Sequence, residues 1–263
     1  MAAIFLADAH LKGKEDQGYR YLIDFLNILK NGDDDVSETN RESAGNISSS
    51  QTIRGIKDLY IAGDLFDFWF SKENRIYPGF EPIVDMLMAL KNRGIHVHLC
   101  EGNHDFLLED YFANILEMST SEEWLTINLD GIRVLISHGD TIDQTNRPYL
   151  LLRKILRGKA IRFLTKWLPQ PILWSIARKS SEISKANSRD FQNKLVEKMY
   201  QFALEKFAED FDAVILGHCH VPVLRECFMG GRKKTFVTLG DWIAHHSYLY
   251  YANGRFELSY YKP

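Results

Sequence analysis

The sequence predicts an α/β fold in which two β-sheets pack together and helices cover their outer faces, a four-layer αββα sandwich. In the first half of the 263-residue chain, short apolar runs alternate with stretches of helical apolar spacing. Residues 223–261 instead alternate in polarity, as antiparallel strands do. A mostly helical stretch lies between these parts. We therefore expect a core of residues 1–145 and 211–263, with a helical cap insertion at residues 146–210.

The elements of the first half follow from local apolar spacing. Residues 3–7 predict a buried strand, and residues 18–30 have the apolar periodicity of a helix. Residues 31–55 are polar, with three consecutive Asp residues and a run of Ser, so we expect a surface loop. The elements expected next are a strand at 59–62, a helix at 80–92 capped at Gly94, a strand at 97–100 and a helix at 106–116.

The second half is punctuated by Gly, Asn and Pro. The elements expected there are a strand pair at 125–129 and 134–137 turning at Asp130-Gly131, helices across 146–210 with a break near Pro169 and Pro171, a strand at 213–216, and final strands turning at Gly230-Gly231 and Asn253-Gly254.

The composition supports a large core, since 45% of the residues are hydrophobic and 25% are charged. The three Cys residues form no C-x-x-C pair, which favours a reduced, cytoplasmic compartment. Residues 1–7 lack a basic flank and meet Asp8 directly, so we expect a first strand rather than a signal peptide. No uncharged run approaches the ~20 residues that span a bilayer.

Five polar motifs each follow the end of a predicted strand. They are Asp8-Ala9-His10, Gly63-Asp64-Leu65-Phe66-Asp67, Gly102-Asn103-His104-Asp105, Ser137-His138-Gly139-Asp140 and Gly217-His218-Cys219-His220. A single His or Asp at a strand end is more often a capped or solvated residue. Because the carboxyl ends of strands carry the sites of layered α/β folds, however, five such motifs together predict one site.

The residue types in these motifs predict a metal site. Carboxylate, amide and imidazole ligands together suit Mn, Fe or Zn. On an extended segment, residues two apart point the same way, so Asp8 should converge with His10, and His218 with His220. The candidate ligands are Asp8, His10, Asp64, Asn103, His138, His218 and His220. Seven ligands suit two ions better than one, with Asp64 bridging them.

Two divalent ions would also leave the site with a net positive charge. Asp8, Asp64 and a bridging hydroxide offset only part of the charge of the ions, and Asn103 is neutral. Such a site favours a phosphate oxyanion. Two ions roughly 3.5–4 Å apart can activate water and hold the phosphoryl oxygens during an in-line displacement.

The series of motifs resembles the calcineurin-like metallophosphoesterases, whose pattern is D-x-H, G-D-x-x-D, G-N-H-[DE], H and G-H-x-H. The resemblance covers residues 8–220. It implies a first ion on Asp8, His10, Asp64 and His220, and a second on Asp64, Asn103, His138 and His218. It further implies that His104 donates a proton to the leaving group or clamps the phosphate, that Asp105 orients His104, and that Asp67 and Asp140 support the ligands from behind.

Within this superfamily, the chain is most similar to the UDP-2,3-diacylglucosamine diphosphatases of lipid A biosynthesis. The residues that carry this similarity are Gly63-Asp64-Leu65-Phe66-Asp67-Phe68-Trp69, Gly102-Asn103-His104-Asp105-Phe106-Leu107-Leu108, His138-Gly139-Asp140-Thr141 with Tyr149, Lys185-Ala186-Asn187-Ser188 and Leu239-Gly240-Asp241-Trp242. The similarity implies manganese and a metal-bound hydroxide that attacks the α-phosphate, giving UMP and 2,3-diacylglucosamine 1-phosphate. It also implies that the enzyme works at the inner face of the cell membrane. The expected substrate contacts are Asn103, His104, Tyr149, Arg178, Ser184, Lys185, Asn187 and His218.

The cap insertion has the composition of a lipid-binding segment. Residues 147–194 hold twelve Lys or Arg and only two acids, a net charge of +10 in a chain of net charge −3. The same stretch is rich in Leu, Ile, Phe and Trp, so we expect contact with an anionic membrane surface or with acyl chains. A helix pair that packs on the core through its apolar face would look similar. Nucleic acid also attracts basic residues, but the apolar content argues against it as a partner.

Two other functions stay open. The best-known diphosphatases carry Arg where this chain has His104, which favours a phosphoesterase acting on a soluble nucleotide, dinucleotide or phosphoprotein. A non-catalytic scaffold on the same fold is the other alternative, although all seven expected ligands are present. We expect no obligatory protein partner.

Overall fold

A computed structural model describes residues 1–32, 53, 55–71, 75–158 and 189–262. Most of the predicted loop at 31–55 therefore lies outside the described residues. So do the predicted break at Pro169 and Pro171 and the expected substrate contacts Arg178, Ser184, Lys185 and Asn187.

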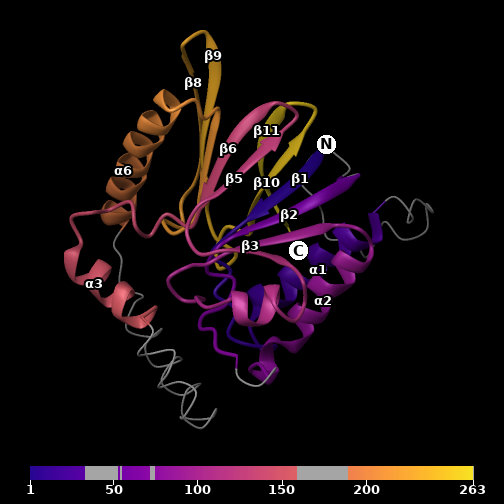
Figure 1. The fold of residues 1–263 in the computed structure, drawn as a ribbon. Coiled ribbons are helices and arrows are strands. Elements are labelled where there is room, and N and C mark those ends of the chain that lie inside the picture. Colours follow the sequence, from indigo (N-terminus) through magenta and orange to yellow (C-terminus); the bar gives the residue numbers. More distant parts are fainter. Residues whose placement is uncertain (33–52, 54, 72–74, 159–188, 263) are drawn as a thin grey trace.

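The described residues form two mixed sheets (Figure 1). The six-stranded sheet has the order β11-β10-β1-β2-β3-β4, and the five-stranded sheet has the order β5-β6-β7-β9-β8. The first sheet consists of β1 (Ala2–Leu6), β2 (Ile56–Ala62), β3 (His96–Cys100), β4 (Ser119–Ser121), β10 (Ser247–Ala252) and β11 (Arg255–Tyr260). The second consists of β5 (Leu125–Leu129), β6 (Ile132–Ser137), β7 (Ala213–Leu216), β8 (Pro222–Met229) and β9 (Arg232–Leu239). Strands β1 to β4 are parallel, as are β6, β7 and β9, so their carboxyl ends meet at one edge of each sheet.

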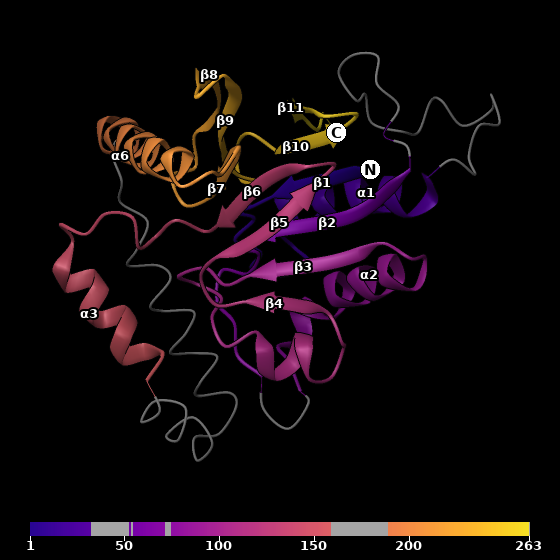
Figure 2. The ribbon, with the colours of Figure 1, turned by 45° about the horizontal axis from the view of Figure 1, so that its top comes forward.

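Helices cover the outer faces of both sheets, which confirms the predicted four layers (Figure 2). The helical elements are α1 (Gln17–Asn31), η2 (Pro78–Phe80), α2 (Glu81–Asn92), η3 (Glu109–Ala113), α3 (Arg147–Leu156) and α6 (Arg189–Ala208). Helices α1 and α2 lie on the six-stranded sheet, and α6 lies on the five-stranded sheet. Helix α3 stands apart, beyond the carboxyl ends of the strands (Figure 2).

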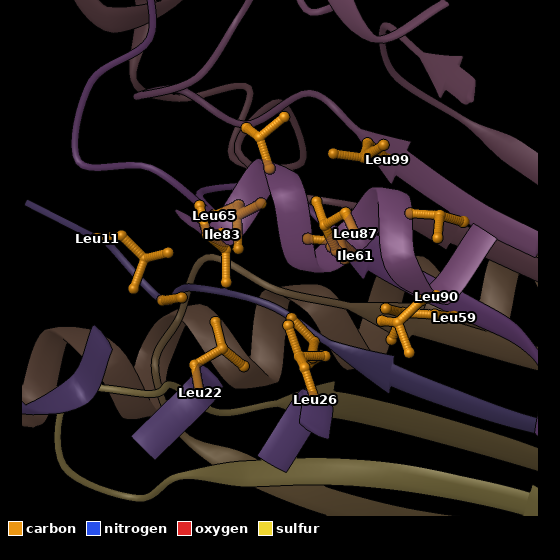
Figure 3. Close-up of a cluster of buried hydrophobic side chains, with 14 of the residues drawn as sticks. Leu11, Leu22, Leu26, Leu59, Ile61, Leu65, Ile83, Leu87, Leu90 and Leu99 are labelled. Carbon is orange, nitrogen blue, oxygen red and sulfur yellow. The ribbon is translucent and has the colours of Figure 1, made fainter. Parts of the chain in front are cut away.

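Three hydrophobic clusters lie between these layers and hold them together. In the first, Leu22 and Leu26 of α1 and Leu87 of α2 pack against Ile61 and Leu99 of the six-stranded sheet (Figure 3). The second lies between the sheets and includes the stacked rings of Phe5 and Tyr60, and the third joins α6 to the five-stranded sheet. Burial of apolar side chains on both faces of each sheet is the main force that holds the strand ends in place.

The structure differs from the predicted elements at two places. Strand β4 was not expected, because its three residues are polar and lack an apolar pattern. The helix predicted at 106–116 is reduced to the π-helical turn η3. Leu107 has a left-handed φ of 63°, and the Leu108 amide donates to the Glu101 carboxylate at 2.8 Å, so a regular helix does not start there.

The predicted turns are present. Gly94 follows the cap residue Arg93 of α2 with a φ of 85°, which ends this helix by a left-handed turn. The glycines at 230, 231 and 254 also have positive φ. The four final strands, however, divide between the sheets, because β8 and β9 belong to one and β10 and β11 to the other. The connection between β9 and β10 therefore crosses the strand ends, which brings Asp241 to the predicted site.

Candidate metal centre

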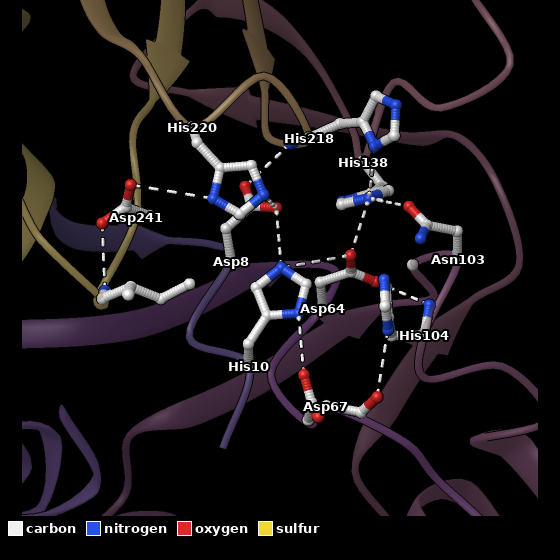
Figure 4. Close-up of polar contacts among 12 residues, drawn as sticks. Asp8, His10, Asp64, Asp67, Asn103, His104, His138, His218, His220 and Asp241 are labelled. Carbon is white, nitrogen blue, oxygen red and sulfur yellow. Dashed lines mark hydrogen bonds and ion pairs between the residues drawn. The ribbon is translucent and has the colours of Figure 1, made fainter. Parts of the chain in front are cut away.

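Five strand ends bring all seven predicted ligands together (Figure 4). In the six-stranded sheet, β1 leads to Asp8 and His10, β2 to Asp64, and β3 to Asn103. In the five-stranded sheet, β6 leads to His138 and β7 leads to His218 and His220. The site is thus built by both sheets at once.

The paired ligands do not lie on extended segments, so this part of the prediction was wrong. Asp8 and His10 have φ values of 54° and 45°, and His218 and His220 have φ values of 69° and 58°. In each pair, two left-handed residues flank one buried residue, Ala9 or Cys219, and the side chains of the two left-handed residues lie on the same side. Asp and His adopt this conformation more readily than most residues, and its cost is concentrated at functional sites.

A first group of side chains surrounds the Asp8 carboxylate, which is fully buried. Its Oδ1 atom lies 3.6 Å from Nε2 of His220 and 3.8 Å from Nε2 of His10. Among the described residues, neither Oδ1 of Asp8 nor Nε2 of His10 has a hydrogen-bond partner. Buried polar atoms rarely stay unpaired, so these converging donors fit a bound cation.

A second group surrounds His138, which is also fully buried. Its Nε2 atom lies 2.9 Å from Oδ1 of Asn103, 3.2 Å from Nδ1 of His218 and 3.3 Å from Oδ2 of Asp64. That same Asp64 oxygen lies 3.6 Å from Nε2 of His10, so Asp64 stands between the two groups. Carboxylate, amide and imidazole atoms meet here without a thiolate, a donor set suited to Mn, Fe or Zn.

The buried carboxylates and imidazoles of the site shift the pKa values of one another. Burial acts to lower the pKa of His138, but the Asp64 and Asp8 carboxylates outweigh this effect and raise the pKa to about 10. Burial and the charge of His138 lower the pKa of His218 to about 4. Burial acts to raise the pKa of Asp64, yet His138 and His10 lower it well below its usual range. A divalent ion bound here would therefore replace the proton of His138, because only a neutral imidazole is a ligand.

Glycines allow the loops to approach this closely. A Cβ atom on Gly102 would lie 2.0 Å from Oδ1 of Asp64, and one on Gly63 would lie 2.6 Å from Nδ1 of His138. A side chain at either position would displace a candidate ligand.

Asp67, Asp105 and Asp140 have distinct surroundings. Oδ1 of Asp67 lies 3.7 Å from Nδ1 of His10, on the side away from the site, and its carbonyl oxygen lies 3.0 Å from Nδ1 of His104. The Asp105 carboxylate accepts hydrogen bonds from the amides of Asp64 and Gly102, each at 2.9 Å. It therefore holds the backbone of two loops, whereas the His104 ring, which it was expected to orient, rests on the carbonyl of Asp67. Asp140 binds α3, through the Tyr149 hydroxyl and Nε of Arg153.

Asp241 has a role at the site that was not predicted from the sequence. Its Oδ2 atom lies 3.7 Å from Nδ1 of His220, and its Oδ1 atom accepts three backbone N–H groups, those of Ile243, Ala244 and His245, at 2.7–3.1 Å. Asp241, within the Leu239-Gly240-Asp241-Trp242 motif, lies 21 residues beyond His220 and follows a different strand. Because β9 pairs parallel to β7, the residues that follow the two strands meet at one edge of the sheet, which places this carboxylate behind His220.

We expect Asp241→Asn to weaken the binding of divalent ions by about 10–100-fold, since a carboxylate behind a ligating His orients it and raises its basicity. Calorimetric titration with Mn²⁺ measures this change. Asp210→Asn is the matched control, because Asp210 is exposed and pairs with Arg232 far from the site. Equal Mn²⁺ affinity of the two variants would contradict the expectation.

Comparisons with known proteins agree with this geometry. A family model described as calcineurin-like phosphoesterase matches residues 1–222. The chain belongs to the calcineurin-like phosphoesterase family. The match includes every one of the seven candidate ligands and residues 146–210, which the sequence predicts to be a cap insertion.

Three calcineurin-like phosphoesterases that are similar in sequence share one name. The UDP-2,3-diacylglucosamine hydrolase of Aeromonas salmonicida (strain A449) is 31% identical over 197 residues, which cover 74% of this chain and 77% of the relative. Its namesake from Histophilus somni (strain 129Pt) is 32% identical over 193 residues, covering 73% and 80%. That of Aeromonas hydrophila is 26% identical over 251 residues, covering 95% and 94%. The protein is thus a metal-dependent hydrolase rather than a scaffold without activity, and it is related to enzymes named UDP-2,3-diacylglucosamine hydrolase.

Proposed function

We propose that this phosphoesterase hydrolyses the diphosphate of UDP-2,3-diacylglucosamine, giving UMP and 2,3-diacylglucosamine 1-phosphate, a step of lipid A biosynthesis. The observation that carries the proposal is the position of α3, which exposes apolar side chains beside a site suited to phosphate chemistry. The shared name of the relatives supports the same substrate.

Two divalent ions would be held by the two groups of side chains. Asp8, His10 and His220 would hold one ion, Asn103, His138 and His218 the other, with Asp64 shared between them. When bound, such ions polarise phosphoryl oxygens and supply a nucleophilic water at neutral pH. We take Mn²⁺ as the first ion to test, while Fe and Zn suit the same donor atoms.

The remaining site residues would act on the phosphates. The backbone N–H of His104 donates to Oδ1 of Asp64 at 2.8 Å, which fixes the His104 ring at the edge of the site. A carbonyl oxygen only accepts, so Nδ1 of His104 carries the proton that binds the carbonyl of Asp67. When the ring carries a second proton, Nε2 is then the atom that can donate to a phosphate oxygen or give that proton to the leaving group. Asn103, next to it, can contact the same phosphate through its amide.

Helix α3 would receive the acyl chains. None of its residues is buried, and Leu151, Leu152 and Ile155 are each more than half exposed. The helix also carries basic residues in its last turn. An apolar stripe with basic neighbours suits a lipid headgroup region, so we propose peripheral binding to the inner face of the cell membrane from the cytoplasm. Within the described parts of the chain, no helix has the length and apolar character needed to cross a bilayer. Tyr149, Arg178, Ser184, Lys185 and Asn187 stay proposed substrate contacts.

Product analysis tests the reaction. The protein is incubated with Mn²⁺ and UDP-2,3-diacylglucosamine in ¹⁸O-labelled water, and the products are read by mass spectrometry. Attack on the α-phosphate places the label in UMP, whereas attack on the β-phosphate places it in the acylated sugar phosphate. Intact lipid, together with hydrolysis of a soluble nucleotide or dinucleotide by the same sample, would support the soluble-substrate alternative that His104 favours.

We expect replacement of Leu151, Leu152 and Ile155 together by Ser to lower binding to phosphatidylglycerol vesicles at least about tenfold, because partial burial of each side chain contributes on the order of 1 kcal/mol. Vesicle flotation at moderate salt measures the binding. Phe228→Ser is the control, since Phe228 is highly exposed on the β8–β9 hairpin away from α3. Wild-type flotation of the triple variant, or none by the wild type, would remove α3 from the membrane hypothesis.

A further inference from the structure

Helix α3 is fixed to the described core by polar contacts at both of its ends. The Tyr149 hydroxyl and Nε of Arg153 both bind Oδ2 of Asp140, the latter at 2.8 Å. Arg157, which caps the helix at its carboxyl end, binds the loop after β3. Because α3 has no buried residue, these contacts rather than apolar packing set its position.

Arg157 makes two bonds to neighbouring groups of that loop. One of its terminal nitrogens binds the Glu101 carboxylate, and the other donates to the carbonyl oxygen of Gly102 at 2.7 Å. The guanidinium also lies over the Phe106 ring, 5.5 Å from its centroid. The Glu101 side chain is 3% exposed and the Arg157 side chain 14%, so this pair is largely removed from water.

Glu101 and Arg157 together hold the loop that carries Asn103 and His104. The second oxygen of Glu101 accepts the amide of Leu108 at 2.8 Å, which closes the loop at its far end. The amide of Gly102 donates to Asp105, so both peptide groups around Gly102 are fixed. The absence of room for a Cβ on Gly102 means that this loop rests directly against Asp64.

We propose that Arg157 is a positioning residue that sets Asn103 and His104 against Asp64 and links their position to that of α3. This inference rests on the proposed metal and phosphate roles of Asn103 and His104. Removal of Arg157 would leave Glu101 as a buried carboxylate without its cation, which is strongly unfavourable. The loop would rearrange to hydrate Glu101, and the Gly102 carbonyl would lose its donor. Asn103, the next residue, would then shift from His138.

The test compares Arg157→Gln, Arg157→Lys and the control Arg225→Gln. Arg225 pairs with Glu197 on the exposed side of α6, away from the site. Arg225→Gln therefore also removes one Arg–Glu ion pair, as Arg157→Gln does, without changing a contact of the site. Two measurements are made on each: Mn²⁺ binding by calorimetry, and hydrolysis of bis(p-nitrophenyl) phosphate, which has no acyl chain to contact α3. We expect Arg157→Gln to weaken the second Mn²⁺ about 10–100-fold and to lower kcat about tenfold, with little change in KM. Arg157→Lys should recover part of both, since it keeps the charge but not both bonds.

The outcomes separate this proposal from the others. If α3 and Arg157 serve lipid binding alone, Arg157→Gln keeps wild-type Mn²⁺ affinity and wild-type kcat on the aryl diester, which overturns the proposal. If the wild type leaves UDP-2,3-diacylglucosamine intact, the proposed substrate fails, but the Mn²⁺ titration still decides the role of Arg157. Glu101→Gln provides a second route, because it should reproduce the loss while leaving Arg157 in place. A double variant no worse than either single variant would show that the two residues act as one unit.

Discussion

Asp64→Ala is expected to abolish turnover and the binding of both metal ions together. Its carboxylate lies between the two groups of donors, with Oδ2 near Nε2 of His138 and Nε2 of His10, and its Oδ1 atom accepts the His104 amide. Among the described residues, Asp8 is the other carboxylate that lies close both to His138 and to the pair His10 and His220. Loss of this shared ligand should remove several kcal/mol of transition-state stabilisation, or more than about 10³-fold in kcat/KM.

Asp64→Asn sharpens this test. The amide keeps the size of the side chain and can still accept the His104 N–H, but it removes the negative charge. Asp58→Asn is the matched control, because Asp58 is a buried carboxylate on the same strand, β2, and contacts His96 and His98 instead of the site. Mn²⁺ stoichiometry and turnover of the aryl diester are measured for both. Two Mn²⁺ ions per chain in Asp64→Ala would contradict the shared-ligand role, and equal losses in Asp58→Asn would show a general effect on folding.

The arrangement of this site was largely predictable because its signals are local. Each buried strand that leads to a ligand is a short apolar run, and the polar residues follow at once in the sequence. Because parallel strands place their carboxyl ends at one edge of a sheet, the site could be predicted without knowing the order of the strands. Asp8 and His220 could therefore be assigned to one site although they are far apart in the chain.

The rest depends on tertiary contacts that leave no local pattern. Strand β4 is polar and forms only because β3 offers a free edge to it. Regular helix is lost near Leu108 because a side chain, Glu101, takes the amide that would begin it. Asp241 reaches His220 because β9 pairs parallel to β7, whereas the polarity pattern of this region predicted antiparallel strands. Likewise, the left-handed backbone at Asp8 and His10 is imposed by hydrogen bonds to the neighbouring loop, at 3.1 Å to the Gly63 carbonyl and 2.9 Å to the Asp64 carbonyl.

His104→Ala should keep both metal ions and lower kcat about 10²–10³-fold, the usual loss when one donor to a developing charge is removed. The backbone N–H that binds Asp64 remains in this variant, so the metal groups stay assembled. Calorimetric Mn²⁺ titration beside steady-state kinetics separates the two effects. Unchanged turnover would remove His104 from the mechanism, and loss of Mn²⁺ would reassign it to the metal groups.

The leaving group decides between the two roles of His104. In the proposed reaction the group that departs is a phosphate monoester, whose second pKa is about 6, so it leaves without a proton at neutral pH. A clamp on the phosphate is then the more useful role for Nε2, and its loss should cost the same for every leaving group. We therefore expect His104→Ala to slow p-nitrophenyl and alkyl phosphodiesters by similar factors. A much larger loss for the alkyl ester, which needs protonation, would instead assign His104 as the proton donor.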